Sequence, residues 1–511
     1  MAKYKKYSYD QGQLIPVRFE EQILPGTFEY ALSYIVDNEL DLSVFEGRYK
    51  NDDTGAPAYD PAVLLKIVLY AYSRGIIHSR KIEKFCCDNV IFMALSANTR
   101  PHFTTIADFI SSMKKEITPL FRDILLYCDE MGLIEKTMFA VDGCKLPSNA
   151  SKEWSGTRAD FTKKIEKLEK TIGYIMDKHK TEDEKDTRGI SKKEEKKHVE
   201  NIKKKISKLK SFLNDHDDKK GPKGTIRKSN ITDNESAKMP SSHGVIQGYN
   251  GIAVSDSKHQ VIVHAEAFGE GHESVLLKPM IEGTRNNFKP DTGENVFKDA
   301  KLITDAGFHS GKNIELVEDE KIDAYMPDNR FRKRDVRFAE AGRHRKPVDR
   351  KKKKYKAKYF RVEDFKHDEE KKKMICPAGK ELYVKNRNFE VRGFKAIAYR
   401  AKITDCRNCK LRKKCLRNPN TISRQVHVFY ENKPEKNFLL EKMKKKIDSA
   451  IGRYIYSKRM GIVEPVFANI RSNIGLDKFT LRGKDKVDTQ WKLFAIVHNL
   501  GKIFRYGSGF A

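Results

Sequence analysis

Long hydrophobic runs are missing from this sequence, and its first residues lack an apolar segment. No stretch approaches the ~18 consecutive apolar residues that a membrane-spanning helix needs. The opening residues, MAKYKKYSYDQGQLIP, carry positive charge but no apolar core, so they do not predict a secretory signal. We therefore expect a cytoplasmic protein with no membrane partner.

Cysteine is also scarce, with eight residues in a chain of 511. Half of them cluster between residues 376 and 415, which argues against the disulfide framework of a secreted protein. The other four lie in apolar surroundings and are expected to be core thiols. They are Cys86, Cys87, Cys128 and Cys144.

Acidic residues are few relative to basic ones. The chain has 71 Asp and Glu against 101 Lys and Arg, a formal net charge of +30. A field of that sign attracts polyanions, so nucleic acid is the expected partner. A soluble protein with a basic surface is the alternative that charge alone leaves open. The length predicts about two to four structural units.

Residues 1–135 predict a helical N-terminal domain. Apolar residues recur at helical spacing from Pro61 to Ser96, and Asp60 before Pro61 fits a helix N-cap. Four basic side chains near a junction between helices would suit a DNA-reading domain, although a plain helical core fits equally well. They are Arg74, His78, Arg80 and Lys81.

Residues 136–329 predict a mixed α/β sheet. Short apolar strands are expected near 136–144, 245–268 and 301–307, with a helix at 273–284. Between the first strands, residues 160–215 show apolar positions three and four residues apart, which predicts an antiparallel helical hairpin. A solvated coiled coil and an arm that contacts DNA are both compatible with this hairpin.

Two aspartates share one context in this sheet. Asp142 ends the apolar run MFAV, and Asp305 ends the run KLIT. A carboxylate at the carboxyl end of a buried strand points into a crevice beside the sheet, where Mg²⁺ finds the oxygen ligands it prefers. The small residues that follow, Gly143 and Ala306-Gly307, would let a metal and its phosphate come close. Taken singly, each aspartate could be a plain turn former.

A third acid, Glu464, lies in the segment YSKRMGIVEPVFANIRSN. Arg471 follows it by seven residues, nearly two helical turns, so both are expected on one face of a helix. Tyr456 and Arg459 precede it. Basic side chains at these positions can bind phosphates beside a metal.

These segments, in this order, resemble the DDE transposases of bacterial insertion sequences. The resemblance covers nearly the whole chain. It is carried by YDPAVLLKIVLYAYSRGIIHSRKIE, FTTIADF, VDGCKLPSNAS, HGVIQGYNGIAVSDSKHQVIV, LITDAGFHSGKN, YSKRMGIVEPVFANIR and FAIVHNLGKIF.

The resemblance implies an α/β multidomain protein. An RNase H-like catalytic domain, a mixed sheet with helices, would follow the all-α N-terminal domain and be interrupted by insertions. Asp142, Asp305 and Glu464 would hold two Mg²⁺ or Mn²⁺ ions. Tyr456, Arg459 and Arg471 would bind phosphates. The sequence departs from the family signature in two places, because four residues separate Arg459 from Glu464 instead of three, and Arg471 replaces a lysine.

The implied activity is metal-dependent cleavage of insertion-sequence ends and strand transfer into target DNA. The partner would be double-stranded DNA, both terminal inverted repeats and target, bound by a homodimer associated with the nucleoid. A nuclease of the same fold that does not rejoin strands is one alternative. A catalytically silent DNA-binding descendant and a basic RNA-binding protein are two others, although no recognised RNA motif is present.

Residues 330–361 form the most basic stretch, with 16 Lys or Arg against three acidic residues. Its place inside the chain predicts phosphate binding, and a mobile charged loop is the alternative. The residues expected to contact DNA are Arg330, Arg332, Lys333, Arg334, Lys351, Lys352, Lys353 and Lys354.

The clustered thiols Cys376, Cys406, Cys409 and Cys415 follow this stretch. Four thiolates suit a tetrahedral structural Zn²⁺, while free or redox cysteines and an iron–sulfur cluster are alternatives. Residues 330–430 are therefore expected to form a basic, cysteine-containing insertion. Residues 431–511 would complete the catalytic domain with the helix that carries Glu464.

Overall fold

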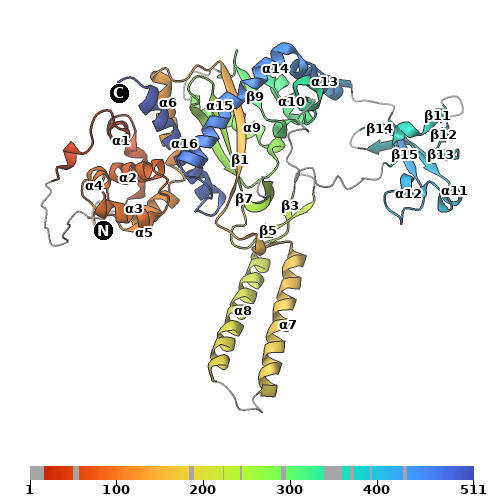
Figure 1. The fold of residues 1–511 in the computed structure, drawn as a ribbon, viewed down its shortest axis with the longest axis horizontal. Helices are drawn as coiled ribbons and strands as arrows, with labels where there is room; N and C mark the ends of the chain where they lie inside the picture. The colour runs from red at the N-terminus through yellow and green to blue at the C-terminus, as the bar shows by residue number, and fades with distance from the viewer. Residues whose placement is uncertain are drawn as a thin grey trace, which may run out of the picture. The chain divides into compact units, whose positions relative to one another are not determined.

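In the computed structural model, the chain forms two compact units (Figure 1). The first comprises Met1–Phe308, Glu320–Ala324 and Ile455–Ala511, and the second comprises His309–Asp319 and Tyr325–Tyr454. The described residues are 17–49, 57–182, 189–221, 224–241, 244–288, 295–338, 359–368, 373–391, 394–429 and 434–510.

Helices make up the described part of the chain before the first strand. They are η1 (Phe19–Glu21), α1 (Phe28–Asn38), η2 (Leu42–Arg48), α2 (Pro61–Ser73), α3 (Ser79–Asp88), α4 (Val90–Leu95), α5 (Phe103–Ser111) and α6 (Ile117–Glu130). Helix α2 begins as the sequence predicts. The Asp60 side chain accepts a hydrogen bond of 2.7 Å from the Ala62 N–H, and Pro61 has no N–H that would need a partner in the first turn. It ends before Gly75, whose φ of 72° suits glycine.

The C-terminal helix α16 (Lys484–Tyr506) joins these helices to the sheet of the first unit. It packs against α1, α2 and α6 on one side and against strand β8 (Ile262–Phe268) on the other. The Asn499 side chain accepts the Ile262 N–H and donates to the Ile262 carbonyl, both at 2.8 Å. The N-terminal helices and the sheet therefore belong to one compact unit. In the described part of the chain, no helix is long and apolar enough to span a membrane.

The sheet of the first unit has strand order β10-β9-β1-β7, and both β6 and β8 pair with β7. Its strands are β1 (Met138–Pro147), β6 (Ala237–Ser241), β7 (Gly244–Asp256), β8, β9 (Lys301–Thr304) and β10 (Asp323–Tyr325), and α9 (Leu277–Phe288) packs on it. Strand β1 is parallel to β9 and antiparallel to β7. The mixed α/β sheet that the sequence predicts is confirmed.

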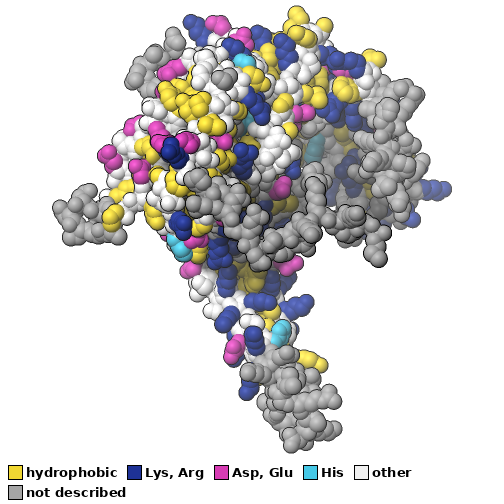
Figure 2. Space-filling model, turned by 60° about the vertical axis from the view of Figure 1, so that its left-hand side comes forward, with side chains coloured by type: hydrophobic (Ala, Val, Ile, Leu, Met, Phe, Trp, Pro, Cys, Tyr) yellow, Lys and Arg dark blue, Asp and Glu magenta, His cyan; other side chains and the backbone are white. Residues whose placement is uncertain are grey.

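A helical hairpin separates β1 from β6, as the apolar spacing predicts. Helices α7 (Arg158–Glu182) and α8 (Gly189–Asp215) lie side by side in Figure 1. Six buried residues form the core between them: Phe161, Ile165, Ile202, Ile206, Leu209 and Phe212. On the face drawn in Figure 2, Lys and Arg side chains stand among other side chains on the described part of the hairpin. Short strands at its base are β2 (Ser155–Gly156), β3 (Lys219–Lys220), β4 (Ile226–Arg227) and β5 (Ser229–Asn230).

The second unit contains a five-stranded antiparallel sheet in the order β11-β12-β13-β14-β15. Its strands are β11 (Lys366–Asp368), β12 (Lys373–Ile375), β13 (Glu381–Val391), β14 (Phe394–Ala401) and β15 (Gln425–Phe429), with helices α11 (Ile403–Arg407) and α12 (Arg412–Cys415) between the last two. The same unit holds α10 (Gly311–Asp319), η6 (Phe331–Arg334), η7 (Val336–Phe338) and α13 (Pro434–Asp448).

A broken helical run leads from α13 back into the first unit. Helix α14 (Ala450–Ser457) is followed by α15 (Arg459–Ala468), which has Pro465 inside it, and by a π-helical turn, Asn469–Asn473. Proline removes one backbone donor from the helix, and π turns are rare and often lie at functional sites. Helix α15 packs on β1 and β7.

Burial of His498 predicts that the fold loses stability in mild acid. Its Nε2 lies 2.9 Å from the Gln260 carbonyl and its Nδ1 lies 3.0 Å from Nδ2 of Asn469, which suits a neutral ring that donates through Nε2. Burial lowers the pKa of His498 to about 4. In the unfolded chain the His498 ring takes up a proton near pH 6.5, whereas in the folded protein it stays neutral down to about pH 4. The free energy of unfolding therefore falls as the pH falls through this window.

Between pH 6.5 and pH 4, we expect the free energy of unfolding of His498→Gln to fall by about 3 kcal/mol less than that of the unchanged protein. Chemical denaturation at stepped pH measures it. The exposed His216, changed in the same way, is the matched control and should leave the slope as it is. An unchanged slope in His498→Gln would show that this ring does not titrate with folding.

Candidate active site

Asp142 and Asp305 lie side by side because β1 and β9 are parallel neighbours. In their register Val141 lies opposite Thr304, so the next residue along each segment is an aspartate. Asp305 directly follows the last residue of β9, whereas Asp142 lies in the middle of β1, so the expectation that Asp142 ends its strand is wrong. The structure thus brings together the two carboxylates that the sequence singled out.

A buried arginine bridges the two carboxylates. Nη1 of Arg459 donates to Oδ2 of Asp142 at 2.7 Å, and its Nη2 lies 3.9 Å from Oδ1 of Asp305. Arg459 is 8% exposed and begins α15, the helix that packs on β1. The sequence predicts phosphate binding for this side chain, whereas the structure pairs it with both aspartates.

Burial dominates the electrostatics of Asp142 and raises the pKa of its carboxyl to about 6. The Arg459 charge and the Gly143 N–H, which donates to Oδ1 at 2.8 Å, act in the opposite direction, and the Asp305 charge raises the pKa further. A carboxylate that loses so much hydration needs a cation beside it to stay ionised. Arg459 supplies one here, and a divalent metal could supply another.

The small residues after the aspartates leave room for other side chains of the chain itself. A Cβ on Gly143 would lie 2.8 Å from Oδ1 of Asn250, and one on Gly307 would collide with the Glu273 carboxylate. Glu273 also pairs with Lys145 at 3.4 Å. Our interpretation of these glycines as room for a ligand therefore needs correction, since Asn250 and Glu273 fill that space. No motif in the sequence marked these two residues.

Three residues of the predicted signature, Tyr456, Arg459 and Arg471, lie near β1 or near one another, whereas Glu464 lies apart from them. The Tyr456 hydroxyl is close enough to Arg459 to influence its pKa, and Arg471 is close enough to Cys144 to lower the pKa of that thiol against the effect of burial. Glu464 is exposed on α15. Five residues at about 100° each place it roughly 140° around the helix from Arg459. Its role as the third metal ligand stays a prediction.

Across the residues that the structure describes, no group of three or more His, Cys, Asp or Glu side chains is arranged to hold a metal ion. What the structure does show is a converging pair of oxygen donors around one cation, Arg459. Two aspartates in this arrangement fit the donor chemistry of Mg²⁺ or Mn²⁺.

Comparison with known proteins gives two matches to protein families. The family called Transposase DDE domain matches residues 375–504, and the family called Transposase domain (DUF772) matches residues 17–112. These matches support a DDE transposase of the insertion-sequence type. Searches of the curated proteins and of the solved structures gave no match.

The matched ranges cover only part of the candidate site. Tyr456, Arg459, Glu464 and Arg471 lie within the DDE match, as does the sheet of the second unit from Ile375 onward. The match to the other family covers the helices from η1 to α5 and ends inside the loop after them. The two aspartates lie outside both ranges, so their assignment depends on sequence pattern and strand register.

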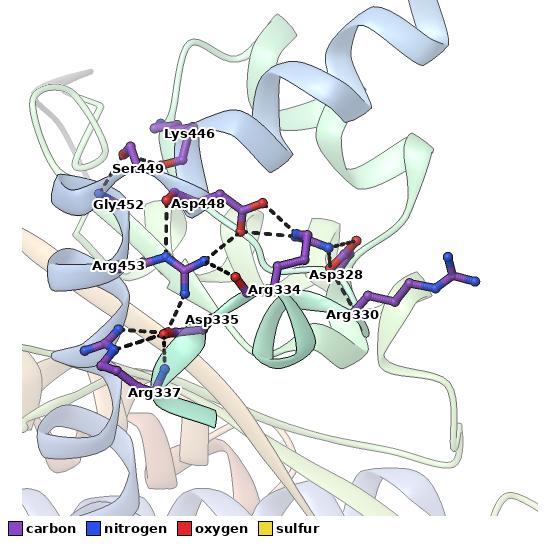
Figure 3. Close-up of polar contacts among 10 residues, drawn as sticks. All are labelled: Asp328, Arg330, Arg334, Asp335, Arg337, Lys446, Asp448, Ser449, Gly452 and Arg453. Carbon is purple, nitrogen blue, oxygen red and sulfur yellow. Dashed lines mark hydrogen bonds and ion pairs between the residues drawn. The ribbon is translucent and has the colours of Figure 1, made fainter. Parts of the chain in front are cut away.

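The second unit holds part of the predicted DNA-binding segment in an ion-pair network (Figure 3). Nε of Arg334 contacts Asp448 at 2.6 Å and its Nη1 contacts Asp328 at 2.9 Å. Arg453 links Asp448, at 3.4 Å, to Asp335. Hydrogen bonds from Arg337 and the Arg453 charge lower the pKa of Asp335 to about 2. Arg334 therefore ties η6 to the end of α13.

Other members of the predicted DNA-binding set differ from Arg334. Arg330, Arg332 and Lys333 are exposed, and the Arg330 side chain points away from the network in Figure 3. Lys351, Lys352, Lys353 and Lys354 lie outside the described residues. Phosphate binding by this segment stays a prediction, and the structure separates an anchoring arginine from three exposed cations.

We expect Arg334→Ala and Arg330→Ala to affect different properties. Loss of Arg334 removes one ion pair from Asp328 and one from Asp448. The free energy of unfolding should therefore fall by about 2 kcal/mol. Loss of Arg330 should leave stability unchanged and weaken duplex binding. Thermal melting and fluorescence anisotropy measure the two effects. Equal stability of both variants would show that the network contributes nothing.

The four clustered cysteines line one pocket in the second unit. Cys376 lies in the turn between β12 and β13, where the Lys380 N–H donates to its Sγ at 3.4 Å and Gly379 has a φ of 76°. Cys406 and Cys415 lie on α11 and α12, and Cys409 lies between these helices. All four are free thiols. They share a pocket without standing in a metal-binding arrangement, so the zinc assignment stays a prediction.

Elemental analysis of the purified protein tests this assignment. We expect one Zn²⁺ per chain, because the core under this sheet is small and four thiolates around a metal would stabilise it. Replacing Cys406 and Cys409 together by Ser should remove the metal, and the exposed Cys87→Ser is the matched control. Zinc-free protein, or zinc retained in the double variant, would contradict the prediction.

Proposed function

We propose that this chain cuts DNA at the ends of an insertion sequence and joins the freed ends to target DNA. The observation that carries the proposal is the pair Asp142 and Asp305, side by side where β9 ends next to β1, with Arg459 between them. The two transposase family matches support the DNA substrate.

The order of elements supports an RNase H-like catalytic domain. A strand bearing Asp142 is followed by an insertion, the three antiparallel strands β6, β7 and β8, a helix, and a parallel strand that leads to Asp305. The helix expected to bear the third acid, α15, packs on β1 beside them. The N-terminal helices, which one transposase family matches, would then form a DNA-binding part of the same unit.

Asp142 and Asp305 would hold Mg²⁺ or Mn²⁺, with Glu464 as the third ligand. Bound divalent metal activates water and stabilises the charge on a leaving 3′ oxygen. Arg459 neutralises the two carboxylates, and Tyr456 and Arg471 bind phosphates next to them. In the joining step, the freed 3′-hydroxyl attacks a target phosphodiester, so that one phosphodiester bond forms as another breaks. The chain itself supplies position and charge.

The charge of the chain suits a polyanionic duplex. A net charge of +30 raises the encounter rate with DNA and implies a strong dependence of affinity on salt. We propose terminal inverted repeats and target DNA as the two duplex substrates, a homodimer as the assembly on them, and association with the nucleoid.

Asp142→Asn, Asp305→Asn and Glu464→Gln test the site directly. Each should reduce cleavage of a duplex carrying the element's ends by about 10³-fold or more, equivalent to about 4 kcal/mol of transition-state stabilisation. Folding and DNA binding in EDTA should persist. Glu282→Gln, an exposed carboxylate on α9, is the control and should cleave normally. Normal Mg²⁺-dependent cleavage by any of the three variants would remove that residue from the site.

A nuclease of the same fold would cut without joining, and the same carboxylates would serve it. Gel analysis of products from a cleaved end and a supercoiled target separates the two functions. Joined products of defined length support the transposase. Cleavage at the element's ends with no joined product, under conditions where cleavage is complete, supports the nuclease.

A further inference from the structure

A basic groove begins beside the two aspartates in the first unit. Its near part is lined by Gly143, Cys144 and Arg471, and its far part includes Gly307, two residues after Asp305. The two parts share Lys145 as well as Pro240 and Glu273, and each is about 1260 Å³ including its open mouth. The two parts therefore adjoin, and they extend from residues that neighbour Asp142 and Asp305 in the sequence to Arg227 and Lys228 at the base of the helical hairpin.

Positive charge dominates the lining of this groove. Its Lys and Arg residues are Lys145, Lys219, Arg227, Lys228, Lys238 and Arg471, and its acids are Glu270, Glu273 and Asp477. Two of the acids are already neutralised, Glu270 by Arg227 and Glu273 by Lys145. The remaining field favours an anion along the whole length of the hollow.

The far cations are placed to reach a ligand. Lys238 is exposed on β6, and Lys228 is about half exposed between β4 and β5. Lys228 lies 3.6 Å from Asp160, a surface pair that contributes little and can be given up to a phosphate. Lys219 is partly buried at the back of the groove, with its Nζ 3.5 Å from the Ser236 carbonyl.

The shape and chemistry of the lining identify the ligand class. The cations come from separate elements, β1, β3, β4, β6 and the π-helical turn, and they line both parts of the groove. Among the described residues that line it, none is Phe, Tyr or Trp. Proteins that bind single strands stack bases on such rings, whereas the backbone of a duplex is bound largely through Lys and Arg. The lining therefore suits the phosphates of duplex DNA.

We propose that this groove binds the DNA backbone next to the phosphodiester at Asp142 and Asp305, and that Lys228 and Lys238 each contact a phosphate. The inference rests on the proposed function, and it adds the path of the bound DNA from the carboxylates toward the hairpin. Because the contacts are to phosphates, the groove holds any sequence equally.

The double variant Lys228→Ala, Lys238→Ala tests this path. Affinity for a random duplex, measured by fluorescence anisotropy in EDTA at 150 mM salt, should fall about 30-fold for two lost phosphate contacts. The slope of log affinity against log salt should become shallower by about two units. Lys228→Arg with Lys238→Arg keeps both charges and should retain affinity.

Lys278→Ala with Lys298→Ala is the matched control, since both lysines are exposed in the first unit and neither lines the groove. It removes the same charge and should change affinity and slope far less. Equal losses in test and control would show a general charge effect and overturn the groove. Unchanged affinity and slope in the test variant would overturn it too.

Two further outcomes separate this inference from the proposed function. A loss of affinity confined to one duplex sequence would mean that the groove reads bases, which overturns the phosphate assignment. A wild-type protein that binds no duplex at all would overturn the proposed function, and the groove with it. Strong binding that survives the double variant would overturn the groove alone.

Discussion

The parallel pairing of β1 with β9 is the constraint on which the candidate site depends. Its register places Val141 opposite Thr304, so that Asp142 and Asp305 follow as neighbours. A slip of one residue would turn one carboxylate to the opposite face of the sheet. Two close carboxylates repel each other, and burial of Asp142 adds to the cost of its charge, so a cation beside the pair stabilises it. Arg459 meets that need, which ties the packing of α15 on β1 to the electrostatics of the site.

The shape of the segment after Arg459 explains how two distant arginines reach the same strand. In a regular α-helix Arg459 and Arg471 would be about 120° apart around the axis. The π turn that contains Arg471 is wider and rotates less per residue, so it brings Arg471 back toward the face of Arg459. Arg459 meets Asp142 and Arg471 lies near Cys144, two residues along β1. Glu464 lies between them on a different face.

Basic residues in this chain have two distinct uses. Arg334 and Arg453 are bound to aspartates and hold η6 against the end of α13, while Arg330 and its exposed neighbours face outward. In the first unit, Arg227 and Lys145 are paired, and Lys238 is exposed in the same groove. A net charge of +30 therefore overstates the charge available to DNA, because part of it stabilises the fold.

The sequence by itself determined the local elements and the two aspartates. Apolar spacing predicted the hairpin helices α7 and α8, and Asp60 with Pro61 predicted the start of α2. Short apolar runs correctly predicted the strands that lead to Asp142 and Asp305, although β1 continues past Asp142 to Pro147. These features depend on residues a few positions apart, where periodicity and capping chemistry act.

Only the tertiary structure decided what surrounds those residues. Arg459 and Asp142 are 317 positions apart, and no local pattern relates them. No local pattern relates Glu273 to Gly307 or Arg334 to Asp448 either. The packing of α15 likewise decided that Glu464 lies on an exposed face of that helix. Such contacts follow from strand register, helix docking and the cost of burying a charge without a partner, and these act only once distant segments have packed together.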